Sequence, residues 1–301
     1  MARADIAVIV TTYNQKKFIG QCISSVLAQK TSAKFTVYVH DDCSSDGTQT
    51  VIDEYAQMFP GKVIPVLSNI NKLSNRKSPI LDMVRLVEEE YIAFCNGDDY
   101  WTDPNKLEYQ LEKLLGNSRA GIVHTAFMIL NEELVDAKPE REPINLRVVR
   151  SKVKNAYDFV IGCQVKESSV MIRKSKVDFG FLLGANHLRA SDWILYLSIS
   201  LESEIIFIDK EMLVHRYTEQ GVWNGARLEH REHMKDEVRW YAASNCPEIE
   251  LRQLFRDRVT QDFLLTKIKR KGILRLLLRI TEPLRHPIRI IKKSVREFYI
   301  N

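Results

Sequence analysis

Residues 91–101 read YIAFCNGDDYW, an apolar run that ends in two adjacent carboxylates. The uninterrupted apolar stretch is typical of a strand buried on both faces of a parallel sheet. Three similar runs precede it, at residues 6–10, 35–39 and 63–67, and their spacing of roughly 28 residues suits repeated strand–helix units. Amphipathic helical patterns fill the first two intervals. The sequence therefore predicts an α/β fold with a Rossmann-like, mostly parallel sheet flanked by helices.

The rest of the chain continues this pattern and then changes character. Three further strands are expected, at residues 121–130, 169–173 and 205–208. A helix is expected to begin near Ser191, whereas residues 131–165 are polar and irregular and are typical of a loop or an insertion. From residue 226 the pattern is helical. We predict a first domain of residues 1–225 and a helical C-terminal region of residues 226–301.

The composition predicts a soluble protein with a substantial core. Hydrophobic residues make up 45% and charged residues 28% of the 301 residues. The sequence contains no apolar run long enough to cross a bilayer, and its first residues do not resemble a signal peptide. The five cysteines are scattered and form no metal-binding spacing. This use of cysteine favours a reducing compartment, so we expect a cytoplasmic location.

The charge of the chain is unevenly distributed. Residues 264–301 hold 11 Lys and Arg against two acidic residues, a net charge of +9, so the preceding residues sum to −4. Basic and apolar residues alternate there at helical spacing from residue 266 onward. Such helices can lie on an anionic membrane surface, and we expect a peripheral position on its inner face. The alternative is that the apolar stripes pack on the protein body. Because the basic residues are confined to this tail, no nucleic-acid partner is expected.

Polar residues follow the predicted strands where each one ends. In parallel sheets, ligands bind beyond the carboxyl ends of the strands. Asp98 and Asp99 follow the strand at 91–95, and carboxylates of this kind bind Mg²⁺ or Mn²⁺ together with substrate phosphates. Asp42 follows the strand at 35–39, where a carboxylate can accept the imide N–H of a uracil or thymine ring. The alternative for both positions is an acidic turn that caps the next helix.

Four pieces of sequence together resemble a known family. They are VIVTTYNQ (residues 8–15), VHDDCSSDGT (39–48), YIAFCNGDDYW (91–101) and ASDW (190–193). In this order and at this spacing they resemble the family-2 glycosyltransferases of the GT-A fold, over roughly residues 4–225. The bacterial members of this family that build surface polysaccharides are the most similar type.

The resemblance implies a role for each matching residue. Those implied to contact the nucleotide are Thr11, Tyr13, Asn14, Asp42, Arg76 and Asp98. Asp99 is implied to bind the metal, Mn²⁺ or Mg²⁺, beside the diphosphate. Asp192 is implied to be the catalytic base. Two departures from the family pattern are that Ser191 stands where relatives often have Glu, and that the residues around Arg76 match loosely.

The implied chemistry is transfer of a sugar with inversion at the anomeric carbon. The donor would be a UDP-sugar or a dTDP-sugar, because the two bases present the same imide to Asp42. Asp192 would take the proton of the acceptor hydroxyl, on a glycan that we expect to be lipid-linked. The alternative role of Asp192 is a plain helix cap, and a residue at a helix N-terminus can combine both roles.

Weaker candidates surround these positions. Trp101, Trp193 and Trp223 could line an acceptor groove, because sugars stack on aromatic faces, although a tryptophan is more often core. His215 could reach the metal or the diphosphate. Arg216 is the better phosphate partner of the two.

Two other functions remain open from the sequence. A nucleotidyltransferase would place a nucleotide on a similar sheet, but it would hold the phosphates with a Gly-rich loop where this chain has Thr11 to Asn14. A non-catalytic module that binds nucleotide-sugars at the membrane would keep the fold without needing Asp192.

Overall fold

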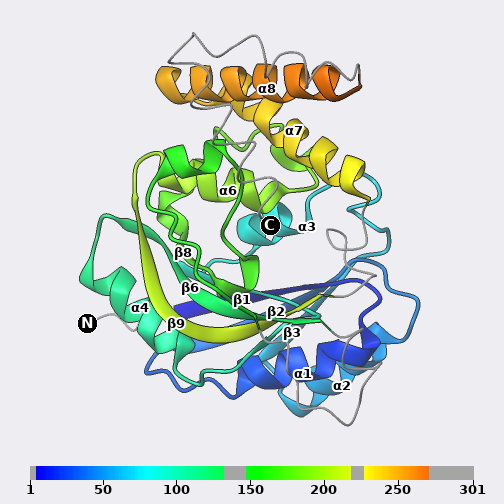
Figure 1. The fold of residues 1–301 in the computed structure, drawn as a ribbon. Coiled ribbons are helices and arrows are strands. Elements are labelled where there is room, and N and C mark those ends of the chain that lie inside the picture. The colour runs from blue at the N-terminus through cyan, green and yellow to red at the C-terminus, as the bar shows by residue number, and fades with distance from the viewer. Residues whose placement is uncertain (1–4, 132–146, 218–226, 271–301) are drawn as a thin grey trace. The chain divides into compact units, whose positions relative to one another are not determined.

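The computed structural model describes residues 5–131, 147–217 and 227–270. A nine-stranded sheet runs through them in the order β3-β2-β1-β4-β8-β6-β9-β5, with β7 paired to β6 (Figure 1). The strands are β1 (Asp5–Thr12), β2 (Lys34–Asp41), β3 (Val63–Leu67), β4 (Tyr91–Asn96), β5 (Tyr100–Trp101), β6 (Ala120–Asn131), β7 (Arg147–Val149), β8 (Met171–Arg173) and β9 (Glu204–Tyr217). The α/β fold and the mostly parallel sheet predicted from the sequence are confirmed.

The direction of the strands changes across the sheet. β1, β2, β3 and β4 are parallel to one another, as the repeated strand–helix units require. β8 runs antiparallel to both β4 and β6, and β9 is parallel to β6 but antiparallel to β5. This reversal places the start of β8, rather than its end, beside the carboxyl end of β4.

Helices cover both faces of the sheet (Figure 1). The α-helices are α1 (Lys16–Leu27), α2 (Thr48–Met58), α3 (Pro79–Leu86), α4 (Lys106–Gly116), α6 (Ser191–Ser200), α7 (Leu228–Asn245) and α8 (Ile249–Arg270). The 3-10 helices are η1 (Ala156–Val160), η2 (Glu167–Ser169), η3 (Lys174–Lys176) and η4 (Ala185–His187). The helix expected near Ser191 is therefore present as α6. The pattern at 169–173 forms a shorter strand than expected, because its first residues belong to η2.

Alternate residues of β1 enter two separate hydrophobic cores. Val8 packs with α1, α2 and α4 on one face, whereas Ile9 packs with α3, α6 and α7 on the other. Both side chains are fully buried. This double burial explains why the strand sequences are continuously apolar rather than alternating.

The chain divides into two compact units, Met1–Phe255 and Arg256–Asn301. α7 and α8 confirm that helices follow the sheet as far as residue 270, and the predicted helical character of residues 271–301 lies outside the described residues. The boundary expected after residue 225 lies outside the described residues and stays a prediction. Within the described ranges, no helix is both long enough and apolar enough to span a membrane.

We expect Gly121→Ala to destabilise the protein by about 1–3 kcal/mol, because an added methyl group overpacks the core. A Cβ at this position in β6 would lie 2.6 Å from Cγ2 of Ile199 and 2.8 Å from Cβ of Ser203. Gly116→Ala is the matched control, because nothing lies within 4 Å of the new Cβ. Urea unfolding measures both variants, and equal stabilities would contradict this account of the packing.

Candidate active site

The carboxyl ends of three parallel strands form one rim of the sheet. Thr12 of β1 is paired with Asp41 of β2, and Thr11 of β1 is paired with Asn96 of β4. The loops that follow these strands therefore start side by side. Tyr13, Asn14, Asp42 and the Asp98–Asp99 pair follow these strand ends, whereas Thr11 lies in β1 and Arg76 lies in the loop after β3.

The Asp99 side chain at this rim is held by several hydrogen bonds and by an ion pair. Its carboxylate is fully buried. Oδ1 accepts hydrogen bonds from Nδ1 of His215 at 2.8 Å and from the backbone N–H of Arg216 at 3.1 Å. Oδ2 accepts from the Ser168 hydroxyl at 2.5 Å and lies 3.5 Å from the ammonium of Lys166. η2 and β9 thus both fasten this one carboxylate.

The pKa values of the adjacent Asp98 and Asp99 carboxyls are shifted in opposite directions. Burial raises the pKa of Asp99, but the charges of Lys166 and His215 and the hydrogen bonds from His215 and Ser168 outweigh it and lower that pKa to about 2. Burial and the neighbouring charge of Asp99 raise the pKa of Asp98 to about 6. Asp99 is therefore firmly ionised, whereas Asp98 ionises at a cost that a bound cation would relieve.

Arg216 holds the turn that carries the two carboxyls. Its side chain is buried, and Nη1 donates to the backbone oxygen of Asp98 at 2.8 Å. The guanidinium lies 4.6 Å from the ring centre of Tyr100 and also donates to Gln21. In this arrangement Arg216 positions Asp98, and the phosphate contact expected from the sequence stays a prediction.

Asp42 anchors the loop that follows β3. Oδ1 accepts from the backbone N–H of Lys72 at 2.6 Å, and Oδ2 accepts from that of Leu73 at 3.0 Å. Burial raises the pKa of Asp42, but the neighbouring His40 imidazole, 3.8 Å from Oδ1, and the hydrogen bonds from these two amides lower it overall. Each carboxylate oxygen retains a second lone pair, so the side chain can still accept from a base.

Asn14 joins the loops after β1 and β2. Its backbone N–H donates to the Ser44 hydroxyl at 2.8 Å, and its side-chain oxygen accepts from the N–H of Ser45 at 2.9 Å. Tyr13 beside it is 45% exposed, so its ring is open to a ligand. Thr11 is partly buried on the same strand.

Strained backbone is concentrated in the loops after the first three strands. Three described residues other than glycine have positive φ, namely Asn14, Cys43 and Arg76. Such a conformation is unfavourable for residues with a side chain and is most often found at functional sites. The guanidinium of Arg76 forms an ion pair with Glu237 of α7.

Asp192 lies in the first turn of α6 and is partly buried. Burial raises its pKa, and the N–H of Trp193 and the charge of Lys166 only partly offset this. The same Lys166 ammonium that lies beside Asp99 therefore also acts on Asp192. The pKa of Lys166, which burial lowers, is raised overall by Asp99, Asp98 and neighbouring acids.

Lys166, which precedes η2, and Glu167 of η2 are site residues that the sequence analysis missed. The Asn96 side-chain amide lies between them, with its nitrogen 3.0 Å from Oε1 of Glu167 and its oxygen 3.2 Å from Nζ of Lys166. Burial and the charge of Asp192 raise the pKa of Glu167 to about 8. These residues precede β8, so they reach the rim only because β8 is antiparallel. Their polarity just before a predicted strand was the available signal.

Two tryptophans predicted to line an acceptor groove lie in the core instead. Trp101 and Trp193 are 4% and 1% exposed. Their indole N–H groups donate to the backbone oxygens of Ser168 and Phe159, each at 3.1 Å. No ring face is available for a sugar to stack on, so that prediction is wrong for these two residues. Trp223 lies outside the described residues.

The Asp98–Asp99 pair fits a hard divalent cation. Mg²⁺ and Mn²⁺ prefer oxygen ligands, and in nucleotide sites one or two carboxylates with phosphate oxygens suffice. Among the residues that the structure describes, no group of three or more His, Cys, Asp or Glu forms a complete metal site. The protein can therefore supply the Asp98 carboxylate directly, whereas a cation on Asp99 would have to replace one of its present hydrogen-bond donors or the Lys166 ammonium. A bound diphosphate would have to supply further ligands.

Comparison with known proteins identifies the family. The family described as glycosyl transferase family 2 matches residues 7–177. An uncharacterized protein of Mycobacterium tuberculosis, Rv1520, is 26% identical over 256 residues, which cover 84% of this chain and 70% of that protein. The chain belongs to glycosyl transferase family 2, and it is a glycosyltransferase, as the resemblance implied.

Relatives with assigned activities agree with this family. The poly(ribitol-phosphate) beta-N-acetylglucosaminyltransferase TarS of Staphylococcus aureus is 26% identical over 155 residues, which cover 48% of this chain and 25% of TarS. The crystal structure of S. aureus TarS 1-349 in complex with UDP-GlcNAc matches with a TM-score of 0.61 at 17% identity. That match covers 86% of this chain and 72% of the TarS chain. The structural likeness confirms the GT-A fold.

We expect Asp98→Asn to stabilise the protein at pH 7.5. The pKa of Asp98 in the folded state, about 6, lies above the ordinary value of 3.8. Its ionisation therefore lowers the stability of the fold as the pH rises between these two values, and the full loss is present at pH 7.5. Removing the charge should add about 1–3 kcal/mol to the free energy of unfolding at pH 7.5 and less at pH 5. Urea unfolding at the two pH values measures the difference.

Asp46→Asn serves as the control of opposite sign. Its carboxylate accepts from the N–H groups of Lys16 and Thr48, and these bonds lower its pKa overall despite burial. This variant should lose stability at pH 7.5. A loss of stability in Asp98→Asn at pH 7.5 would contradict the electrostatic account of the pair.

Proposed function

We propose that the protein is a metal-dependent, inverting glycosyltransferase. It transfers a sugar from a UDP-sugar or a dTDP-sugar to a hydroxyl of a glycan acceptor that is lipid-linked. Asp99 binds Mn²⁺ or Mg²⁺, and Asp192 is the general base. Thr11, Tyr13, Asn14, Asp42, Arg76 and Asp98 contact the nucleotide.

The observation that carries this proposal is the position of Lys166. Its ammonium lies 3.5 Å from Asp99 and also lowers the pKa of Asp192. The Lys166 ammonium therefore acts electrostatically on both the proposed metal ligand, Asp99, and the proposed base, Asp192. A family-2 enzyme needs both groups around one donor sugar, with the base close to the breaking bond. The UDP-GlcNAc bound in the TarS structure supports a UDP-sugar as donor.

Each residue of this rim would have a defined task in the reaction. Asp42 accepts the imide N–H of the base, and Tyr13 offers an exposed ring beside it. Asp192 takes the proton of the acceptor hydroxyl as that oxygen bonds to the anomeric carbon and the bond to the diphosphate breaks. Its raised pKa makes it a stronger base than an ordinary aspartate. Asp99 would hold the divalent cation, which would supply charge neutralisation for the departing diphosphate.

We expect Asp192→Asn to lower the rate of transfer about 10²–10⁴-fold while leaving nucleotide binding unchanged, because only the base is lost. Release of nucleoside diphosphate from UDP-, dTDP- and GDP-sugars measures turnover, with and without EDTA. Calorimetry with UDP and Mn²⁺ measures binding. Asp99→Ala is the complementary variant and should weaken both turnover and binding of UDP with Mn²⁺.

Three outcomes would contradict parts of this proposal. Full turnover by Asp192→Asn would remove its role as the base. A product that retains the anomeric configuration, determined by NMR, would exclude a single displacement. Binding of UDP without turnover of any donor would favour a nucleotide-sugar-binding module instead.

We further propose that residues 266–301 dock on an anionic membrane surface. The support is the net charge of +9 over residues 264–301 and the helical spacing of their apolar and basic residues. A chain that ends at residue 265 should lose binding to vesicles containing phosphatidylglycerol but keep donor hydrolysis. Vesicle sedimentation at low and high salt checks this. Equal binding by the full and shortened chains would contradict it.

A further inference from the structure

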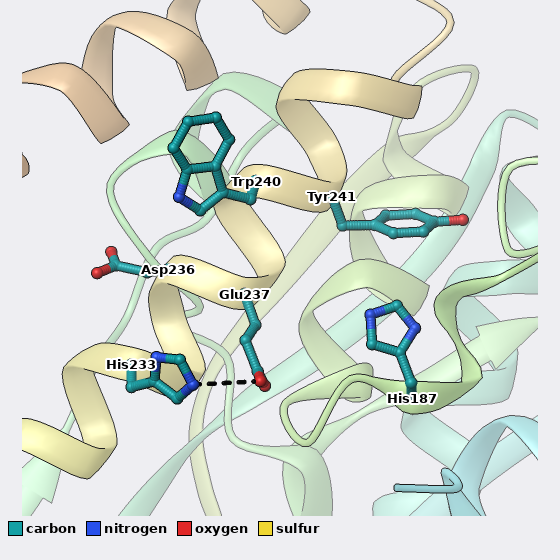
Figure 2. Close-up of a pocket in the computed structure, with 6 residues that line it drawn as sticks. All are labelled: His187, His233, Asp236, Glu237, Trp240 and Tyr241. Atoms are coloured by element: carbon teal, nitrogen blue, oxygen red, sulfur yellow. Dashed lines mark ion pairs between the residues drawn. The ribbon is translucent and has the colours of Figure 1, made fainter.

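A pocket of about 460 Å³ lies on α7, outside the predicted donor site (Figure 2). It belongs entirely to the first compact unit. The residues that line it combine carboxylates, imidazoles and aromatic rings, and they are His187, His233, Asp236, Glu237, Trp240 and Tyr241. None of these residues takes part in the chemistry described above.

The two carboxylate oxygens of Glu237 differ in their polar contacts. Arg76 donates to Oε1 of Glu237, and Nε2 of His233 lies 3.4 Å from the same oxygen. Its Oε2 is buried and has no hydrogen-bond partner within the described part of the chain. A buried carboxylate oxygen without a donor is unfavourable, and a ligand hydroxyl would relieve that cost.

Two aromatic residues, Trp240 and Tyr241, line the pocket. Trp240 is 59% exposed, unlike Trp101 and Trp193, which are buried elsewhere in the core. Tyr241 is fixed because its hydroxyl bonds to the backbone oxygen of Phe181 at 2.7 Å. An open indole face beside hydrogen-bonding carboxylates is suited to a sugar ring, which has an apolar face and a rim of hydroxyls. The carboxylates of Asp236 and Glu237 disfavour a phosphate at the same place.

Residues of this pocket and their neighbours contact the loop that carries Arg76 and the helix that carries Asp192. Through Glu237 the pocket contacts Arg76, which lies in the loop that Asp42 anchors. Next to His187, the side-chain oxygen of Asn186 lies 3.3 Å from the N–H of Ser78. The Ser78 hydroxyl in turn lies 2.6 Å from that of Ser191, the first residue of α6. The pocket is therefore linked by an ion pair and hydrogen bonds to the segments that carry Arg76 and Asp192.

We propose that this pocket binds an uncharged sugar unit of the acceptor, separate from the hydroxyl that reacts. The inference rests on the proposed glycosyltransferase function and adds the acceptor's binding subsite to it. The indole of Trp240 stacks on the sugar ring, and Oε2 of Glu237 accepts a hydrogen bond from a sugar hydroxyl. The acceptor chain thus extends from Asp192 toward α7.

Saturation-transfer NMR with four disaccharides as probes tests this: maltose, cellobiose, lactose and chitobiose. The wild type should bind at least one of them, Trp240→Ala should bind it roughly 10-fold more weakly, and Trp240→Phe should keep most of the affinity because it keeps a ring. Since Trp240 is 59% exposed, its replacement leaves the core intact. Calorimetry with UDP on the same three proteins should give equal affinities.

Two outcomes overturn the inference while leaving the proposed function intact. One is UDP binding without a signal from any disaccharide. The other is disaccharide binding that Trp240→Ala does not weaken. Failure of the wild type to bind UDP would contradict the proposed function, and the disaccharide titrations would still decide whether the pocket is a sugar site.

Discussion

The buried carboxylate of Asp99 is the interaction on which the site depends. A buried charge is tolerated only when it is paired and hydrogen-bonded. Here the partners come from two segments that are distant in sequence. Lys166 and Ser168 lie at the start of η2 and within it, and His215 and Arg216 lie on β9. Satisfying one carboxylate therefore fixes how the end of β4, the start of β8 and the end of β9 meet.

Much of the fold follows from local sequence patterns. The apolar runs correctly predicted β1 to β4. In β1 and β4 they are continuous because a strand buried on both faces needs no polar residue until it ends, whereas β2 and β3 are only partly buried. The same logic predicted that polar residues after β1, β2 and β4 meet at one rim, and the pairing of the strands brings those ends together. The family motifs carried the functional assignment, which the comparisons confirmed at the level of a glycosyltransferase.

The remaining features depend on contacts between distant segments. Lys166 and Glu167 could not be assigned to the site because strand direction is not visible in the sequence, and only an antiparallel β8 brings its start to the rim. Trp101 and Trp193 were assigned wrongly because a tryptophan in a core and one in a groove have the same sequence context. The pocket on α7 was missed because it is formed by two segments whose approach is set by tertiary packing.

The long separation between Asp99 and its partners also bears on how the chain folds as it is made. Arg216 is 117 residues beyond Asp99. The parallel strands β1 to β4 can pair once about the first hundred residues have emerged from the ribosome. The Asp99 carboxylate can form all of its hydrogen bonds only after β9 has been synthesised. A nascent chain that stops before residue 215 carries a negative charge in its sheet with half of its partners missing. Synthesis of β9 is therefore the step that commits the domain to its native state.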